Sequence, residues 1–261
     1  MLGVMRIEDF HVPNPPPGAN ELPSDDGEPM ETQRHREQMN LLIDSLESAW
    51  QDRNDFYVGG NMFVYYSEPQ AREAQRKGTT RFRGPDVFVV LDTDRRERLS
   101  WVAWEEGGKL PDVIVELISP TTEAIDRNEK MNLYAQIWRT NAYFLYDPLK
   151  HRLEGYELVP SKRRYRPMKP LSNGDLWVPS LGLSLGMRDL PCKRLPSPSL
   201  RWIDAEGRVL PSEFELRRTA EEEREQERAA RKRAEEERER ADARIRELES
   251  ALARAKGRPT R

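Results

Sequence analysis

Two short apolar runs, each opened by a Pro-Asp pair, constrain the fold of this chain most strongly. Residues 87–90 follow Pro85 and Asp86, and residues 113–118 follow Pro111 and Asp112. β-branched runs of this length, bounded by turn-forming residues, predict buried strands. If the two strands lie side by side, carboxylates near their ends approach each other.

The two-residue period of a strand shows which carboxylates share a face with which apolar side chains. It places Asp86 with Phe88 in the first run and Glu116 with Ile114 in the second. A carboxylate among apolar side chains must be paired, protonated or bound to a metal. Asp86 and Glu116 converging on one point would form a hard-oxygen site suited to magnesium. In the alternative interpretation, each acid caps a strand end or pairs with a nearby arginine.

A first helix is expected over residues 31–50, where apolar residues recur at helical spacing and Thr32 is a suitable N-cap. His35 lies on the edge of the apolar face, with Glu31 one turn earlier. A histidine in this position is more often a packed, hydrogen-bonded core residue than part of a functional site. Both interpretations of His35 remain open at this point.

A second helix is expected to begin at the hydroxyl cap Ser119 and to run to about Trp138. Its spacing places Asp126 and Lys130 on one side. The same side also carries Leu133, Tyr134 and Ile137. A lysine on an apolar side indicates an anionic partner. The alternative is an Asp126–Lys130 pair at the rim of the helix, which would contribute only a few tenths of a kcal/mol.

The remaining pattern predicts the fold class. Residues 56–58 and 62–66 are expected to form a strand pair or one bulged strand, and 141–147 a further buried strand. Short antiparallel strands follow within 153–178. The order helix, strands, helix, strands predicts an α/β or α+β domain with a mixed central sheet flanked by helices.

A basic stretch that includes Arg81 and Arg83 leads directly into Asp86. A run of charge most often means a solvated loop. Its position beside the predicted carboxylate pair also supports a phosphate-binding role for Arg81 and Arg83.

Composition divides the chain into four predicted parts. These are a Pro-rich flexible arm over residues 1–29, a domain over 30–190, a linker with a small hairpin over 191–212 and a charged helix over 213–257. Ile245, Leu248 and Leu252 fit a heptad seam in that helix, but the earlier seam positions are Ala, Arg or Glu. The tail therefore predicts either a weak coiled coil or an isolated helix stabilised by Glu-Arg pairs.

Charge, cysteine usage and hydropathy exclude several classes of protein. The net charge of -3 argues against a protein that coats nucleic acid generally. One cysteine, Cys192, excludes a disulfide framework and a Cys-based zinc site within one chain. Residues 1–10 lack the pattern of a signal peptide, and no run is long enough for a membrane span. A cytoplasmic protein is expected.

Several short motifs, taken together, resemble those of the large bacterial family of putative restriction endonucleases, which belongs to the PD-(D/E)XK nuclease superfamily. The resemblance covers about residues 30–190, and the charged helical tail after a Trp-containing hairpin is also similar to that of many members. The motifs are Met30-Glu31-Thr32 with His35 and Gln38, and the segments 58–61, 82–86, 101–105, 111–116, 119–122, 126–130 and 146–148.

The resemblance implies a restriction-endonuclease-like core in which Asp86 is the aspartate of the PD motif and Glu116 the second metal-binding carboxylate. Glu31 would add a third acidic ligand. The implied cofactor is Mg2+ or Mn2+.

The superfamily pattern has a lysine two residues after the second acid, where this chain has Ile118. Lys130 on the following helix matches the position to which this family has moved that lysine. His35 and Gln38 match family positions on the first helix, and Asp126 accompanies Lys130; the resemblance gives these three a supporting role.

These inferences predict metal-dependent hydrolysis of phosphodiester bonds in DNA. The alternative is a non-catalytic interaction or DNA-binding module on a nuclease scaffold, assembled through the C-terminal helix with a second copy or another protein. A magnesium-dependent enzyme acting on RNA would differ from the first prediction only in its substrate.

Overall fold

The computed structural model describes residues 18, 32–77, 84–119, 122–191, 193 and 197–256. The chain divides into two compact units, Met1–Ser212 and Glu213–Arg261. The first unit contains every described strand and all the described candidate site residues.

A six-stranded sheet forms the centre of the first unit. Its strands lie in the order β1-β3-β5-β6-β7-β8. β5 and β6 run parallel and the other neighbouring pairs run antiparallel, which confirms the mixed sheet expected from the sequence. The bounds are β1 Phe56–Gly59, β3 Val87–Leu91, β5 Val113–Leu117, β6 Ala142–Asp147, β7 Arg152–Val159 and β8 Arg164–Pro167.

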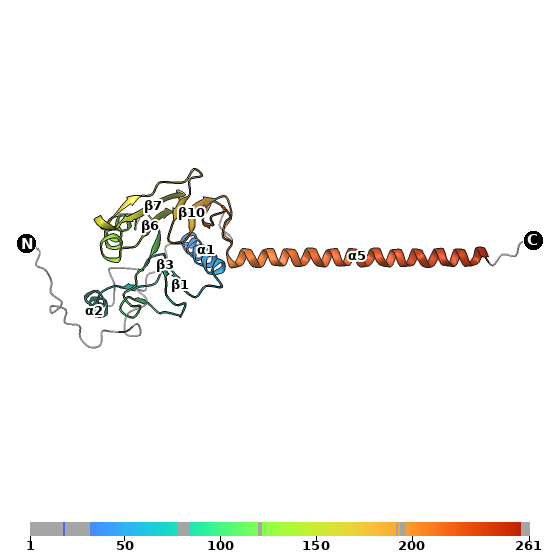
Figure 1. Ribbon diagram of the computed structural model, residues 1–261, viewed down its shortest axis with the longest axis horizontal. Helices are drawn as coiled ribbons and strands as arrows, with labels where there is room; N and C mark the ends of the chain where they lie inside the picture. The colour runs from blue at the N-terminus through green and yellow to red at the C-terminus, as the bar shows by residue number, and fades with distance from the viewer. Residues whose placement is uncertain are drawn as a thin grey trace, which may run out of the picture. The chain divides into compact units, whose positions relative to one another are not determined.

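One face of this sheet is covered by helix α1 (Gln33–Ala49) and by a three-stranded sheet (Figure 1). That sheet consists of β9 (Leu176–Val178), β10 (Leu183–Arg188) and β11 (Ser199–Ile203). The Thr32 hydroxyl caps α1 by accepting a hydrogen bond from the backbone N–H of His35 at 3.2 Å. Leu42 and Leu46, both fully buried, anchor the helix in the larger hydrophobic core.

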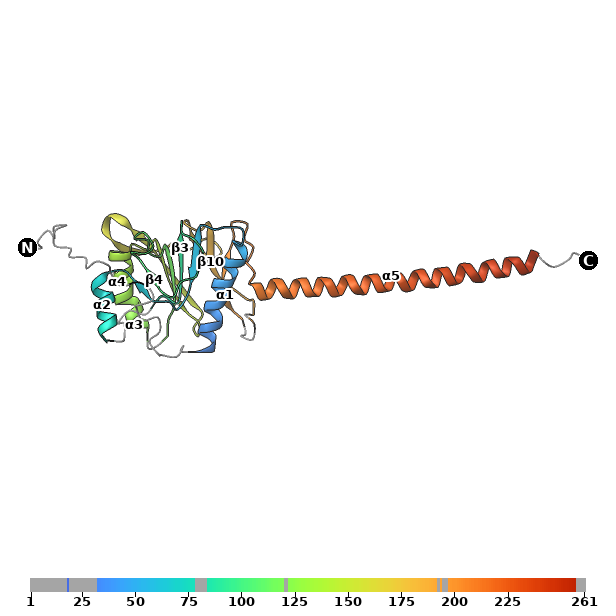
Figure 2. The same cartoon turned by 90° about the horizontal axis from the view of Figure 1, so that it is seen from below.

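The opposite face is covered by a helical segment over residues 123–138, and Figure 2 shows α1 on one side of the strands and α3 and α4 on the other. The segment consists of α3 (Glu123–Ile125), η3 (Asp126–Lys130), α4 (Met131–Leu133) and η4 (Tyr134–Trp138). η3 and η4 are π-helical turns. Phe88 and Ile114 of the sheet pack against Leu133 in the second hydrophobic core.

The π-turns correct one sequence prediction for this segment. The expected cap Ser119 accepts a hydrogen bond at its hydroxyl oxygen from the N–H of Thr122 at 3.3 Å, and the first described helical residue is Glu123. Ile137, predicted on the buried side, is 54% exposed, whereas Tyr134 and Trp138 are buried. A π-turn is wider than the 3.6-residue α-helical turn on which the prediction rested, so it rotates the following side chains.

A small parallel pair of strands lies beside the central sheet. It joins β2 (Val64–Tyr65) to β4 (Trp101–Val102). The predicted pairing of residues 56–58 with 62–66 is therefore wrong, because β1 pairs with β3 instead. Helix α2 (Glu68–Lys77) includes the first part of the basic stretch that was expected to be a loop.

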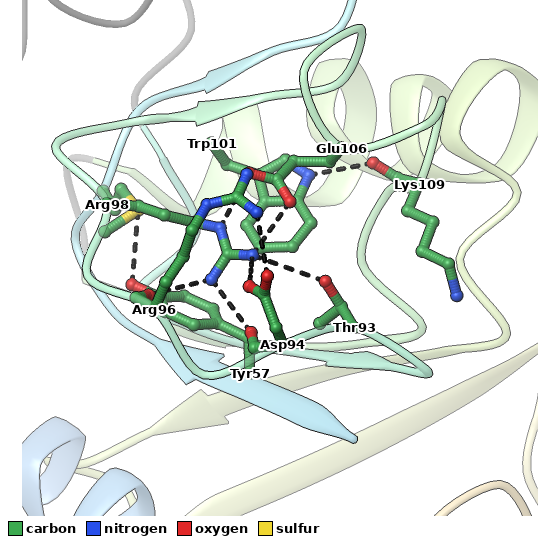
Figure 3. Close-up of polar contacts among 9 residues, drawn as sticks. Tyr57, Thr93, Asp94, Arg96, Arg98, Trp101, Glu106 and Lys109 are labelled. Carbon is green, nitrogen blue, oxygen red and sulfur yellow. Dashed lines mark hydrogen bonds and ion pairs between the residues drawn. The ribbon is translucent and has the colours of Figure 1, made fainter. Parts of the chain in front are cut away.

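A charge cluster centred on the buried side chains of Arg98 and Glu106 joins the loop before β4 to the turn after it. The guanidinium of Arg98 lies 4.8 Å from the ring centroids of both Tyr57 and Trp101 (Figure 3). Its Nε and Nη2 atoms donate to the two oxygens of Glu106 at 2.7 and 2.9 Å, and Nη2 also donates to Asp94 Oδ1 at 2.6 Å. Each charge has a partner within the cluster, so we assign it a structural role in holding this loop.

Residues 199–203, predicted to lie in a linker with a small hairpin, belong to the core. Gln38 Nε2 donates to the carbonyl oxygen of Leu200 at 2.9 Å, and Leu200 N–H donates to Gln38 Oε1 at 3.0 Å. The Trp202 indole donates to the carbonyl oxygen of Leu42 at 3.1 Å. The small hairpin expected within 191–212 has its turn after this strand, where Gly207 N–H donates to the Asp204 carbonyl at 3.1 Å and Ile203 pairs with Val209.

The second unit contains one long helix, α5 (Glu213–Lys256). Arg217 with Glu213 and Arg218 with Glu222 form ion pairs four residues apart, of the kind that stabilise an isolated helix. Ile245 and Leu248, on the predicted heptad seam, are exposed in the single chain. The predicted coiled coil stays a prediction.

Two tryptophans of the three-stranded sheet provide a test of the core. Trp202→Ala should lower the free energy of unfolding by about 3–5 kcal/mol, because Trp202 is fully buried and its removal leaves a cavity. Trp177→Ala is the matched control, since Trp177 is 37% exposed, and should cost about 1 kcal/mol or less. Urea unfolding followed by circular dichroism measures both. Equal losses would contradict the placement of β11 in the core.

Candidate active site

The pairing register of β3 and β5 brings Asp86 and Glu116 together. Val87 is opposite Val115, so the next residues outward are Asp86 and Glu116. The backbone N–H of Asp86 donates to Glu116 Oε2 at 3.4 Å, and the N–H of Leu117 donates to Asp86 Oδ2 at 2.7 Å. Directly opposite residues of an antiparallel pair share a face of the sheet, and this face is the one covered by the π-turns.

Lys130 reaches the carboxylate pair from helix turn η3. Its ammonium nitrogen lies 2.9 Å from Glu116 Oε2 and 2.9 Å from Asp126 Oδ1. Glu116 and Asp126 are both 1% exposed. The anionic partner that the sequence indicated for Lys130 is therefore Glu116 as well as Asp126. Ile118, at the superfamily lysine position, packs in the apolar core of this face.

Tyr134 is a site residue that the sequence analysis did not single out. Its hydroxyl donates to Glu116 Oε1 at 2.8 Å. Tyr143, from β6, donates from its hydroxyl to the backbone carbonyl oxygen of Asp126 at 3.0 Å. The signal available in the sequence was the position of Tyr134 four residues after Lys130, on the same side of the predicted helix.

Burial and crowding of like charges shift the pKa values of the site. Burial raises the pKa of Glu116 to about 8, and Asp86 adds to this rise while the Lys130 ammonium opposes it. Burial also raises the pKa of Asp86, again against the attraction of Lys130. For Lys130, burial lowers the pKa, but Glu116 and Asp126 outweigh burial and hold the pKa above its ordinary value. Three carboxylates thus surround one ammonium, which leaves the site short of positive charge.

His35 fixes the carbonyl group of Leu117, the residue after Glu116. Its Nε2 atom lies 2.9 Å from the carbonyl oxygen of Leu117, and its Nδ1 atom lies 2.8 Å from Thr32 Oγ1. A carbonyl oxygen only accepts, so Nε2 carries a proton and donates. Because the N–H of Leu117 donates to Asp86, both backbone polar groups of this residue are held. His35 is thus a hydrogen-bonded core residue that also contacts the candidate site.

The other predicted site residues lie elsewhere. Gln38 binds the backbone of β11 rather than the carboxylate pair, so its contacts are structural. Glu31, Arg81 and Arg83 lie outside the described residues.

The donor set fits a hard divalent cation in chemistry, although it is incomplete among the residues that the structure describes. Within those residues, no three His, Cys, Asp or Glu side chains form a group that could hold a metal ion. Asp86 and Glu116 supply oxygen donors. The carbonyl oxygen of the next residue, Leu117, accepts from His35. A cation there would supply the positive charge that three carboxylates and one ammonium lack.

A known protein family matches most of the chain. A sequence model of the Uma2 family, described as putative restriction endonuclease, matches residues 7–193. The chain belongs to this family. The match includes Asp86, Glu116 and Lys130 and ends before β11 and α5. No curated protein matches the chain.

The Uma2 match confirms the family resemblance, and the observed α+β architecture agrees with a restriction-endonuclease-like fold. The family description supports a nuclease-type function for the chain. Among the described helices, none is both long and apolar enough to cross a membrane.

The raised pKa of Glu116 predicts how stability depends on pH. The folded chain keeps the Glu116 proton up to a pKa of about 8, whereas the unfolded chain releases it near the ordinary 4.5. Between these values the folded state binds more protons, so its stability falls as pH rises, by up to about 1.4 kcal/mol per pH unit. Glu116→Gln should flatten this slope in urea unfolding between about pH 5 and pH 8.

Glu154 provides the control for this measurement. It lies on the same row of the sheet, across Leu145 from Glu116, and its pKa is lowered to about 2 by the hydrogen bond from Arg127. Its stabilising contribution is complete above the ordinary pKa of 4.5 and is lost only as pH falls toward 2. Glu154→Gln should therefore leave the slope between pH 5 and pH 8 unchanged. An unchanged slope in Glu116→Gln would contradict the assigned protonation of Glu116.

Proposed function

We propose that the chain is a metal-dependent nuclease that hydrolyses phosphodiester bonds in DNA, with Asp86 and Glu116 as ligands of Mg2+ or Mn2+. The observation that carries this proposal is the position of Lys130. Its ammonium lies 2.9 Å from Glu116, on the same buried face as Asp86, and so supplies the cation that Ile118 cannot. A nuclease of the PD-(D/E)XK type needs two acids and one lysine at a single point, and these three residues meet there.

Each residue has a distinct role in the proposed reaction. The metal, when bound, polarises the scissile phosphate and lowers the pKa of a water molecule. Lys130 orients the attacking water and offsets the negative charge that builds up on the phosphate. Asp126 holds the Lys130 ammonium at 2.9 Å. His35 donates to the carbonyl oxygen of Leu117 and so holds the residue that follows Glu116.

DNA is the proposed substrate because the family description names restriction endonucleases. Arg81 and Arg83, which precede Asp86 in the chain, remain the proposed contacts to backbone phosphates. Such contacts position a duplex without reading its sequence.

A second candidate function is a non-catalytic interaction module that assembles through α5. The observation that favours it is the completeness of the Lys130 ion pairs, since Lys130 already bridges Glu116 and Asp126 at 2.9 Å each. A bridge of this kind could serve structure alone. The exposed Ile245 and Leu248 of α5 would then contact a second copy or a protein partner.

Cleavage of supercoiled plasmid in the presence of Mg2+ or Mn2+ tests the first proposal against the second. We expect nicking that EDTA abolishes, and a loss of rate of about a hundredfold or more in Glu116→Gln and in Lys130→Ala, because each removes a charge that acts in the transition state. Lys150→Ala is the matched control, since Lys150 pairs with Asp147 at 3.2 Å on the surface, and it should retain full activity.

The pattern of losses separates the possibilities. If cleavage is lost in Glu116→Gln but not in Lys130→Ala, Lys130 has a structural role only. Folded protein that cleaves neither DNA nor RNA would favour the interaction module. Cleavage of RNA but not of DNA would overturn the proposed substrate and leave the proposed chemistry in place.

A further inference from the structure

The two oxygens of the Glu116 carboxylate have different partners. Oε2 faces Lys130 at 2.9 Å and the backbone N–H of Asp86 at 3.4 Å. Oε1 accepts a hydrogen bond from the Tyr134 hydroxyl at 2.8 Å. The side chain of Glu116 is 1% exposed, so water does not compete for either oxygen. The carboxylate is therefore fixed in rotation as well as in position.

Tyr134 is held rigidly where it makes this contact. It is 1% exposed and begins the π-turn η4. Its ring packs edge-on against Tyr143 with centroids 5.3 Å apart, and against Trp138 at 4.6 Å. Its hydroxyl group is the donor in this contact, and the Glu116 oxygen is the acceptor. The hydroxyl cannot swing away without disturbing this aromatic stack.

We propose that Tyr134 is a positioning residue that occupies Oε1 of Glu116, so that the carboxylate offers a cation only Oε2 and the site favours Mg2+ over Ca2+. This inference rests on the proposed function. Mg2+ demands six ligands in near-octahedral geometry, and it usually takes one oxygen from each of one or two carboxylates and keeps several water molecules. Ca2+ takes six to eight oxygens at longer distances and readily binds both oxygens of one carboxylate. A hydroxyl that occupies Oε1 therefore lowers the affinity of the site for Ca2+.

Tyr143 provides a matched comparison within the same stack. Tyr143 is also fully buried and also donates from its hydroxyl, at 3.0 Å. Its acceptor is the backbone carbonyl of Asp126, so it holds the π-turn and not a carboxylate. Removing either hydroxyl deletes one buried hydrogen bond, but only Tyr134→Phe releases an oxygen of Glu116.

The experiment measures metal binding directly on the full chain. Electron paramagnetic resonance of free Mn2+ gives the Mn2+ affinity, and competition with Mg2+ or Ca2+ gives the affinity of each. In Tyr134→Phe we expect the ratio of Ca2+ to Mg2+ affinity to rise about tenfold, in line with the effect of groups that orient metal ligands. In Tyr143→Phe the ratio should stay within about twofold of the wild-type value. Thermal melts verify that both variants are folded.

An unchanged ratio in folded Tyr134→Phe that binds Mn2+ would overturn this inference and leave the proposed nuclease function standing. Wild-type protein that binds no Mn2+ would overturn both together. A second measurement needs no substitution of Tyr134. The carboxylate bands in infrared difference spectra of wild type and Glu116→Gln, each with Mg2+, should show coordination through one oxygen, and two-oxygen coordination would contradict the proposal.

Discussion

The ion pair between Glu116 and Lys130 is the constraint on which the arrangement of the first unit depends. Glu116 is buried on a sheet face that it shares with Asp86 and with apolar side chains, and an unpaired charge there would cost several kcal/mol. Its partner cannot come from β5 itself, because Ile118 takes the next position on that face. It comes from a helical segment that must therefore dock on this face of the sheet. The π-turns of that segment place Lys130 and Tyr134 on the same carboxylate.

The sequence predicted those parts of the site that depend on a local period. A strand alternates strictly, so Asp86 and Glu116 could be assigned to one face before their strands were known to pair. Lys130 could be selected because a lysine at helical spacing from Leu133 required an anion. Tyr134 could not be assigned in the same way, since its acceptor is 18 residues away in the chain and a helical period does not show which buried hydroxyl finds a carboxylate. Ile137 was also placed wrongly, because a pattern of apolar residues does not show where a π-turn occurs.

Long-range contacts also explain why the extent of the folded unit was harder to predict than its sheet. The hydrogen bonds from Gln38 to Leu200 span 162 residues, and the segment between 191 and 198 has the composition of a linker. Gln38 resembled a family site residue, yet its side chain satisfies the backbone of β11 instead of approaching the carboxylates. Gln38 therefore has a structural role, because its side chain forms hydrogen bonds with buried backbone groups of Leu200.

Lys130 links stability to the proposed chemistry. In the metal-free chain its ammonium lies 2.9 Å from Glu116, and this contact lets a buried carboxylate exist without a bound ion. The same ammonium lies on Oε2, the oxygen that Tyr134 leaves for a metal. A cation entering beside Asp86 and Glu116 must therefore share that oxygen with Lys130 or displace it toward Asp126, which already holds the ammonium at 2.9 Å. Asp126 thus keeps the lysine at the site in both states. A site built with three acids and one lysine can fold without its metal and still bind one, because a cation can replace the proton that Glu116 keeps up to a pKa of about 8.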